Sequence, residues 1–241
     1  MMIILLFFLT HWYLSLFFQT FFLHRYTSHS MFKMNIFWER TFFFLTFLVQ
    51  GSSFLQPAAY GEMHRKHHSF SDTNKDPHSP MWSKNIFSFM WKTFKEYRNL
   101  STQFIDDVSK SSDLPRWKLI ETLGESMIVR IFFVSFYSLL YWIYAPSFWF
   151  FLLIPFHIFM GPIHGFIVNW FGHKNGYRNH KELPDNSKNT LPIDLLMMGE
   201  LYQNNHHKSP NKPKFSHRWF ELDLGYLIMH LLHTLKVIRL V

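Results

Sequence analysis

The 241-residue chain contains no cysteine. It therefore forms no disulfides, offers no thiolate ligands to zinc and holds no iron–sulfur cluster of its own. Charged residues are also sparse, at 17% of the chain, whereas aromatic residues make up 20% and include 30 phenylalanines. This composition is more apolar than that of an ordinary soluble domain and favours a protein that lies in a membrane.

The charged residues are also unevenly distributed. No Lys, Arg, Asp or Glu occurs in residues 1–23, 41–61 or 131–171. The net charge of +8 arises from the segments between these runs and not from one compact basic domain. Blocks of charge separated by uncharged apolar runs are typical of membrane proteins. We therefore expect membrane lipid, and no nucleic acid, among the partners.

Three apolar segments are long enough to cross a bilayer, which takes about 20 residues. They are approximately residues 1–23, 127–145 and 147–171. The first lacks a basic leading segment and a cleavage site of small residues, so it does not resemble a signal peptide. Residues 41–60 have a shorter apolar core that ends in polar residues and glycine. We predict a re-entrant or interfacial helix there, because non-helical backbone at membrane depth must be covered by protein.

Three crossings place every charged block on one side of the membrane. The positive-inside rule makes that side cytoplasmic. Residues 62–126 and 172–241 then form a cytoplasmic helical metal domain above the spans. The prediction is an all-α integral membrane protein with about three transmembrane helices and a re-entrant helix, in which residues 1–241 form a single domain.

Histidine is frequent, with 16 residues, and it is clustered. The central cluster is HRKHH at residues 64–68, which places three histidines at positions i, i+3 and i+4. Such positions share one face of a helix, so the three imidazoles can converge. Neutral imidazole is a good ligand for iron, zinc, copper or nickel. A single histidine pair could arise by chance at this frequency, whereas several clusters together indicate a metal site.

The predicted topology brings the histidine clusters to the same membrane face. Four or five ligands suit one metal ion, so the number of histidines suggests two metals. The candidate ligands are His24, His29, His64, His67, His68, His173, His206 and His207, with Asn169 and Gln203 as less certain members.

Other polar residues beside these clusters have weaker assignments. Four of them are candidates to hold the ligand imidazoles from behind, namely Asp72, Asp76, His78 and Glu200. Three basic residues could meet a CoA phosphate or an acidic electron donor, namely Arg65, Lys75 and Lys84. For His157 and His164, within the third predicted span, we expect a hydrogen-bonded structural role.

Several familiar active sites are absent from the sequence. No Asp or Glu is followed by histidine three residues later, and the patterns His-Glu-x-x-His and Gly-x-Ser-x-Gly do not occur. A histidine-rich metal pair beside apolar spans could use O2 to remove hydrogen from a lipid C–H bond. Two alternatives remain open: a membrane hydroxylase or ketolase that inserts oxygen into a lipid, and a non-catalytic metal-binding membrane protein.

Four segments together resemble the membrane fatty acyl desaturases, most of all bacterial members of the acyl-CoA Δ9 group. They are HRYTSH (24–29), HRKHHSFSDTNKDPHSP (64–80), NWFGH (169–173) and GELYQNNHH (199–207). The resemblance extends from Leu23 to about Tyr226. It implies that the eight histidines are iron ligands and that Asn169 holds a metal-bound water. Gln203 departs from the pattern, because acyl-CoA desaturases usually have histidine there.

The resemblance also implies an activity. It points to a cis double bond introduced into a saturated acyl chain, carried by CoA or by a lipid, with two iron ions as cofactors and O2 as co-substrate. Electrons would come from a separate donor such as ferredoxin or cytochrome b5 with its reductase. The expected location is the bacterial cytoplasmic membrane, with the active site on its cytoplasmic face. This chain has one span before the first histidine cluster, where animal relatives have two.

Overall fold

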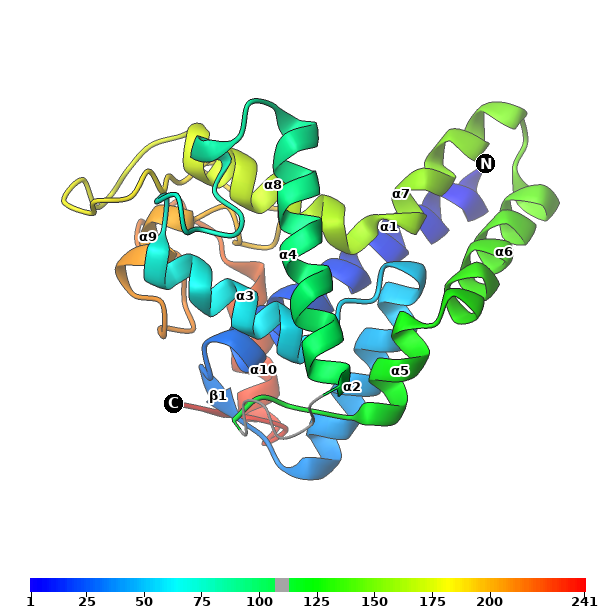
Figure 1. Ribbon diagram of the computed structural model, residues 1–241, viewed down its shortest axis with the longest axis horizontal. Coiled ribbons are helices and arrows are strands. Elements are labelled where there is room, and N and C mark those ends of the chain that lie inside the picture. Colours follow the sequence, from blue (N-terminus) through cyan, green and yellow to red (C-terminus); the bar gives the residue numbers. More distant parts are fainter. Residues whose placement is uncertain (107–112) are drawn as a thin grey trace.

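The computed structural model describes residues 1–106 and 113–241. This part of the chain is mostly helical, as the sequence predicts (Figure 1). Its two short strands, β1 (Phe32–Lys33) and β2 (Arg239–Leu240), pair antiparallel and join the first loop to the C-terminal end. The portion of the predicted segment 62–126 that falls on residues 107–112 lies outside the described residues.

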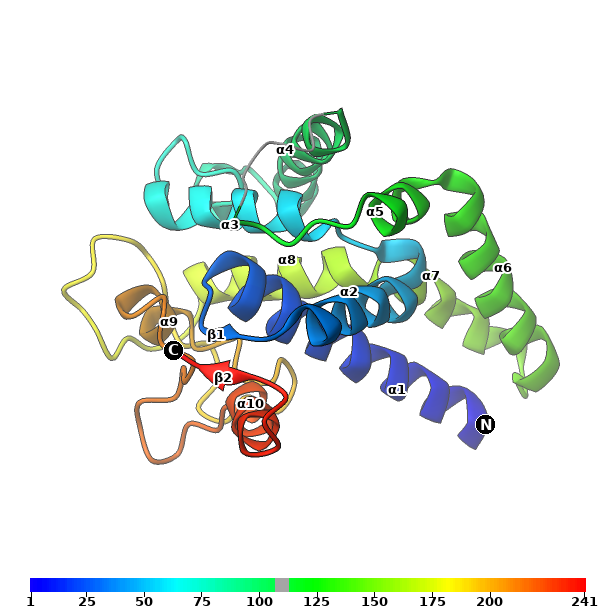
Figure 2. The ribbon, with the colours of Figure 1, turned by 90° about the horizontal axis from the view of Figure 1, so that it is seen from below.

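The helices lie against one another in an elongated bundle. Helix α1 packs against α2 and α8 along its length (Figure 2). The helix bounds are α1 Met2–Phe18, α2 Ile36–Gln50, α3 Pro57–Phe70, α4 Ile86–Asp106, α5 Lys118–Glu125, α6 Met127–Tyr144, α7 Ile154–Ile158, α8 Met160–Lys174, α9 Gln203–Lys208 and α10 Leu224–Thr234; short 3₁₀ helices occupy Gly51–Ser53, Pro80–Trp82 and Phe148–Leu153.

The first predicted span is longer than its apolar run. Helix α1 continues without a break into a π-helix, Gln19–Ser28, so that one helix extends over Met2–Ser28. This helix is long and apolar enough to cross a membrane, as is α6, which matches the second predicted span. The π-helix bonds residue i to residue i+5, which brings His24 and His29 nearly onto one face. Their ring centroids are 5.0 Å apart.

The third predicted span, residues 147–171, is not one continuous helix. The chain forms the 3₁₀ helix Phe148–Leu153, then α7 and α8, and it bends by 72° at the break before Met160. Pro162 explains the break, because proline has no N–H to donate and its ring collides with the carbonyl four residues earlier. The region counts as a single span only if the bent pair is taken together.

The predicted re-entrant segment, residues 41–60, also contains a sharp bend. Helix α2 and the short helix after it meet α3 at 82°. The bend falls on residues 54–56, and Gly51 lies just before it at the end of α2 with φ of 51°, where a Cβ would come within 2.1 Å of the Tyr137 hydroxyl. The turn returns the chain toward the end of the first helix, and it thereby places α3 beside the π-helix.

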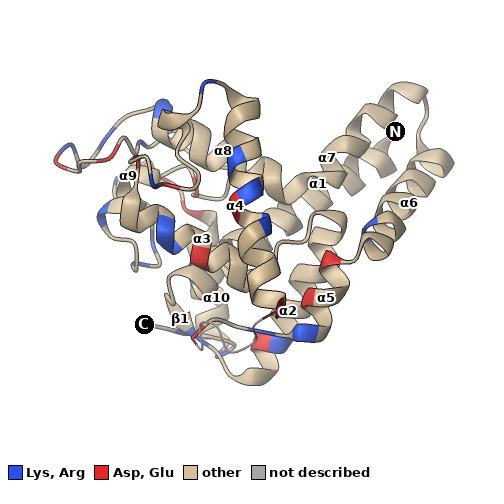
Figure 3. Ribbon diagram, viewed as in Figure 1, with Lys and Arg blue, Asp and Glu red and all other residues tan. Residues whose placement is uncertain are grey.

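Charge is almost absent from the arm formed by α1, α6 and α7 (Figure 3). Arg130, near the start of α6, is the one Lys, Arg, Asp or Glu in these three helices. Apolar residues such as Ile128, Trp142 and Leu6 are exposed on the arm. An exposed apolar surface of this kind is suited to lipid and not to water.

A buried polar network ties this arm together. His11 Nδ1 lies 2.6 Å from His157 Nδ1, the Tyr141 hydroxyl lies 2.9 Å from His157 Nε2, and His11 Nε2 lies 2.8 Å from the Val49 carbonyl. With neutral rings, one arrangement satisfies every group: Tyr141 donates to His157, His157 to His11, and His11 to Val49. The expected hydrogen-bonded role is thus confirmed for His157. The two ring nitrogens of His164 are buried without a hydrogen-bond partner among the described residues, so its hydrogen-bonded role stays a prediction.

Candidate metal centre

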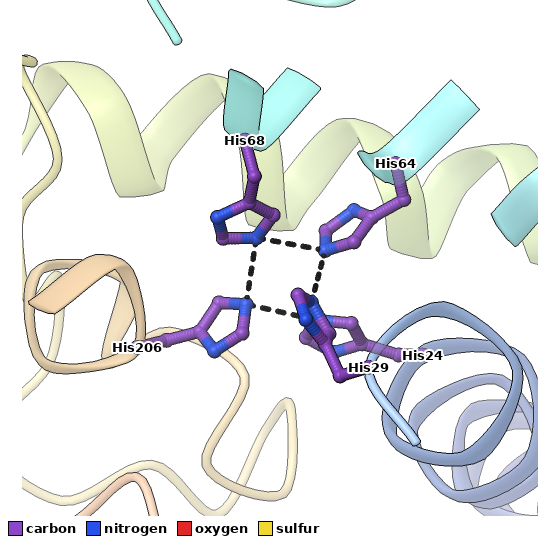
Figure 4. A group of neighbouring side chains, drawn as sticks. All are labelled: His24, His29, His64, His68 and His206. Carbon is purple, nitrogen blue, oxygen red and sulfur yellow. Dashed lines mark hydrogen bonds between the residues drawn. The ribbon is translucent and has the colours of Figure 1, made fainter. Parts of the chain in front are cut away.

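Five histidines from three parts of the chain converge on one point (Figure 4). The π-helix and the residue after it supply two, α3 supplies two and α9 supplies one. One nitrogen of each ring lies within 4.8 Å of one nitrogen of every other ring. This five-histidine group consists of His24, His29, His64, His68 and His206.

The rings of this group direct their Nε2 atoms at one another. The Nε2–Nε2 distance is 3.0 Å from His24 to His206 and 2.9 Å from His68 to His206. It is 2.9 Å from His64 to His29 and 3.0 Å from His64 to His68. The contact between His29 and His64 is informative about topology, because it puts the first two histidine clusters on the same side of the protein.

Three further histidines form a second group beside the first. His67 from α3, His173 from the end of α8 and His207 from α9 each offer a nitrogen within 4.8 Å of the others. The Nε2 atoms of His67 and His207 are 3.3 Å apart. Neighbouring residues of α3 and α9 therefore serve different groups: His67 and His207 belong to this three-histidine group, whereas His68 and His206 belong to the other.

Carboxylates lie behind the rings of the three-histidine group. Asp76 accepts a hydrogen bond from His67 Nδ1 at 2.8 Å, Asp72 from His173 Nδ1 at 2.9 Å, and Asp185 from His207 Nδ1 at 2.8 Å. Carboxylates in this position fix the ring orientation and tautomer of a ligand histidine. Contacts of Asp72 and Asp76 with ligand candidates are thus as the sequence predicts. Asp185 was missed, because it precedes His207 by 22 residues and no local spacing marks it.

Glu200 lies in the same relation to the five-histidine group. Its Oε2 atom is 2.6 Å from His24 Nδ1, and its Oε1 atom accepts a hydrogen bond from the Thr20 hydroxyl. The sequence predicted a contact of this kind for Glu200. His78 belongs to a third, overlapping group with His67 and Asp76, in which each residue offers a ligand atom within 4.8 Å of the others, and the Nε2 atom of His78 is buried without a partner.

The geometry fits bound cations. A histidine whose Nδ1 donates to a carboxylate has a lone pair on Nε2, and two such lone pairs face one another where His67 meets His207. Facing lone pairs repel unless a proton or a metal ion lies between them. The Nε2 atom of His173 is buried without any partner beside the same rings. All-nitrogen donor sets of this kind suit iron and other first-row transition metals.

Burial keeps the rings ready to bind metal. It lowers the pKa of His29, His64 and His206 well below the ordinary value, and the neighbouring histidines lower it further. Burial likewise lowers the pKa of His207 to about 4. Burial alone would raise the pKa of Asp76, but the charge of His67 and its hydrogen bond together lower it to about 2. At neutral pH the imidazoles of His29, His64, His206 and His207 are therefore neutral and the Asp76 carboxylate is charged, which is the state that ligation needs.

Asn169 and Gln203 lie close to the histidines but outside both groups. The Asn169 side-chain amide donates to the Gly165 carbonyl at 2.8 Å. The Gln203 amide donates to the Glu200 carbonyl at 2.7 Å, and Gln203 packs against Gly172, where a Cβ would come within 2.4 Å of its Cγ. A role of either amide in binding metal stays a prediction.

The three basic residues predicted to meet a head group lie at the rim. Arg65 donates to the Ser28 carbonyl at 2.8 Å and pairs with Asp113, so it also ties α3 to the end of the first helix. The Lys75 ammonium lies 5.6 Å from the centre of the Phe70 ring, and Lys84 is exposed. Their contact with a substrate head group stays a prediction.

One buried ion pair near the site was not anticipated. Arg25 is fully buried, its guanidinium lies 2.8 Å from Asp223 and it covers the ring of Phe215 at 4.1 Å. Asp223 also accepts from the Tyr226 backbone N–H at the start of α10. The pair therefore fastens the C-terminal helix to the helix that carries His24. In the sequence, Arg25 stands between two candidate ligands, and no local pattern indicates that it pairs with Asp223 almost two hundred residues later.

Apolar helices of spanning length and two groups of converging histidines define a membrane-associated protein with a histidine-rich centre that could hold metal ions. The chain belongs to the fatty acid desaturase family, whose sequence profile matches residues 1–230. It is accordingly an oxidoreductase that acts on fatty acids, in a family of di-iron enzymes.

Individual relatives agree with this family. The chain is 27% identical over 226 residues to the Delta-9 desaturase-like 4 protein of Arabidopsis thaliana, an alignment that covers 90% of this chain and 69% of the relative. It is 28% identical over 231 residues to the sn-1 stearoyl-lipid 9-desaturase of Synechocystis sp., covering 90% and 64%. It is also 27% identical over 263 residues to the hex-5-enoyl-[acyl-carrier protein] acetylenase of Moorena producens, covering 94% and 73%.

Proposed function

We propose that this desaturase introduces a cis double bond into a saturated fatty acyl chain at two iron ions. One iron would be held by His24, His29, His64, His68 and His206, and the other by His67, His173 and His207. The observation that carries the proposal is the convergence of eight histidines into two groups, with carboxylates behind four of the rings. Asn169 would hold a metal-bound water, and Gln203 would contribute weakly or not at all.

The protein itself holds the ligand histidines in position and keeps bulk water away from the metal centre. Iron, when bound, supplies the oxidising power of O2 that an unactivated C–H bond requires. The aspartates behind His67, His173 and His207 fix the direction of each Nε2. Burial of the rings keeps bulk water away from a centre that must oxidise its substrate and not the solvent.

A cavity beside the histidines supports an acyl substrate. It has a volume of about 100 Å³ and lies between α3, α4 and α8. Leu55, Met63, Phe89 and Phe166 are among the apolar residues that line it, and Asn169 brings it next to the metal groups. The cavity is smaller than the roughly 300–1,000 Å³ of pockets that enclose a whole ligand. Part of an acyl chain would therefore lie against membrane lipid or a second subunit.

The location proposed for the centre is the cytoplasmic face of a bacterial membrane. The 2.9 Å contact between His29 and His64 supports a common face for the first two histidine clusters, because residues in contact cannot lie on opposite sides of a bilayer. That this face is cytoplasmic follows from the positive-inside rule alone. A re-entrant segment between these residues and three crossings overall remain our interpretation of the apolar runs. In this arrangement residues 1–241 act as one membrane-embedded domain, with the metal-binding helices on the cytoplasmic side.

The substrate proposed is an acyl-CoA, with the double bond at Δ9. Two of the relatives described above carry 9-desaturation in their names, one of them as a lipid desaturase. Arg65, Lys75 and Lys84 would meet the head group or a separate electron donor, such as ferredoxin or cytochrome b5 with its reductase. O2 is the co-substrate.

Fatty-acid profiling tests the proposal. A bacterium that makes only saturated precursors in the presence of O2 would express the wild-type protein, His67→Ala or the control His230→Ala, in which an exposed histidine of α10 is removed. We expect a cis-monounsaturated acid from the wild type and the control, and none from His67→Ala. A hydroxylated acid without an alkene would contradict the desaturase assignment. Comparison of acyl-CoA and lipid fractions at early times identifies the carrier.

A further inference from the structure

A second, smaller cavity lies on another side of the metal groups. Its volume is about 20 Å³, and it is formed by residues of the π-helix, α3 and α8 together with Glu200. His24 and His64 of the five-histidine group line it, and so do Asn169, Gln19 and His164. A cavity needs only about 10–15 Å³ to hold a water molecule, provided that polar groups surround it.

Three of the lining residues have buried polar atoms without hydrogen-bond partners: both ring nitrogens of His164, the Oε1 atom of Gln19 and His24 Nδ1. Of these, His24 Nδ1 lies 2.6 Å from the Glu200 carboxylate, so the atoms of His164 and Gln19 are the ones left without a polar neighbour of this kind. His164 is 1% exposed and Gln19 is 5% exposed, so bulk solvent does not satisfy these atoms. The ring of His164 stands edge-on to Trp12 at 4.5 Å between centroids, which satisfies at most one N–H weakly. Buried polar atoms are normally paired with protein or with ordered water.

A water in this cavity would have suitable neighbours on several sides. His164 and Gln19 supply an N–H or lone pair and a carbonyl oxygen, and Asn169 and Glu200 lie on the same wall. The apolar substrate cavity also reaches Gln19 and Asn169, but it is lined mainly by carbon. The small cavity is thus the polar approach to the histidines, and the larger one is the apolar approach.

The proposed reaction requires protons at this place. Formation of one double bond breaks two C–H bonds and reduces one O2 to two water molecules. The substrate gives up two electrons and two protons, so a further two electrons must come from the separate donor and two protons from solution. The histidines of the two metal groups cannot supply these protons while their nitrogens bind metal. Among the histidines that line the small cavity, His164 is the one outside those groups.

We propose that His164 and Gln19 hold a water molecule in this cavity, and that this water passes protons to the metal centre during O2 reduction. His164 acts through the water and is therefore a positioning residue. The inference rests on the desaturase function proposed above. It explains why His164 is buried in α8 without a hydrogen-bond partner, five residues before Asn169 and on a different face of the helix.

The test compares His164→Leu with His164→Gln, which keeps a hydrogen-bonding group, and with Gln19→Leu. His230→Leu is the matched control, because it makes the same change at an exposed site on α10. Each iron-loaded protein is measured for iron content, for double bonds formed per O2 consumed and for peroxide released. A structure at a resolution that shows water gives a readout independent of activity.

We expect all variants to keep the iron content of the wild type. The yield of double bonds per O2 should fall by about tenfold in His164→Leu and in Gln19→Leu. This is a smaller effect than removal of a residue that itself acts as general acid. The O2 that no longer forms double bonds should be recovered as peroxide. His164→Gln should stay within about twofold of the wild type. A water should lie between residue 164 and Gln19 in the wild type and in His164→Gln, and it should be absent from His164→Leu.

An unchanged yield in His164→Leu overturns the inference, and so does a cavity without ordered water in the wild type. Equal loss of iron from His164→Leu and His164→Gln also overturns it, because the histidine would then be a structural support of the centre. If the wild type forms no double bond while the water is present, the proposed function fails on its own.

Discussion

Asp185 accepts a hydrogen bond from His207 Nδ1 at 2.8 Å across 22 residues of the chain. Asp72 and Asp76 do the same for His173 and His67, so each member of the three-histidine group is held by one aspartate. This repetition shows how the weaker of the two candidate sites is organised. It has fewer imidazoles than its neighbour, but each of them has a carboxylate that fixes its direction.

Asp185→Asn should weaken metal binding at the three-histidine group. The loss of a carboxylate behind a ligand histidine typically costs about 10–100-fold in metal affinity. Bound iron in the purified protein, titrated against a chelator, measures the effect. Glu182→Gln is the matched control, because Glu182 is an exposed acid that pairs with Lys208 at 2.8 Å. Equal affinities for Asp185→Asn and the control would mean that His207 needs no such support.

Metal removal should proceed in two steps. The five-histidine group offers more nitrogen ligands than the three-histidine group, so a chelator should empty the three-histidine group first. Iron content and optical or Mössbauer spectra would follow the two populations. His173→Ala should abolish only the first step, and His64→Ala only the second. Release of both ions together in the wild type would show that the groups bind as one unit.

The metal-free protein should lose stability as the pH falls below about 6.5. Burial lowers the pKa of His64, His68 and His206 in the folded protein, while the same side chains titrate near 6.5 in the unfolded chain. Between these values the unfolded chain binds more protons, so the free energy of unfolding decreases with falling pH.

The loss should continue down to about pH 4, where His207 itself becomes protonated in the folded state. Thermal unfolding of the chelated protein in detergent between pH 5 and 8 gives the measurement. The iron-loaded protein is the reference and should melt higher, because bound metal stabilises the folded state. A melting temperature of the metal-free protein that is constant or rises toward pH 5 would be incompatible with neutral buried imidazoles.

Tyr141→Phe should destabilise the apolar arm. The change removes the hydroxyl that donates to His157 Nε2 at 2.9 Å and leaves a buried acceptor unpaired, which typically costs about 1–3 kcal/mol. Thermal unfolding of the full protein in detergent reports it. Tyr144→Phe is the control, since Tyr144 is on the same helix and 45% exposed. Similar melting temperatures for the two variants would show that His157 finds another donor.

The sequence predicted which segments are apolar and which histidines could bind metal. It did not predict where the apolar segments bend. The apolar run at residues 127–145 predicted α6 because apolar length is a local property. The same criterion gave no sign of the bend within residues 147–171, where the apolar run continues but Pro162 breaks the helix. Composition therefore indicates that a segment is apolar, while a 72° bend depends on a single residue and its neighbours.

The sequence by itself determined which imidazoles could act together, because the spacing of His64, His67 and His68 places them on one helical face. Only the tertiary structure decided that His67 and His68 serve different groups, that Asp185 supports His207 and that His164 has no partner. The physical reason is that a helix fixes the direction of its own side chains. What each side chain meets depends on segments that arrive from elsewhere in the chain.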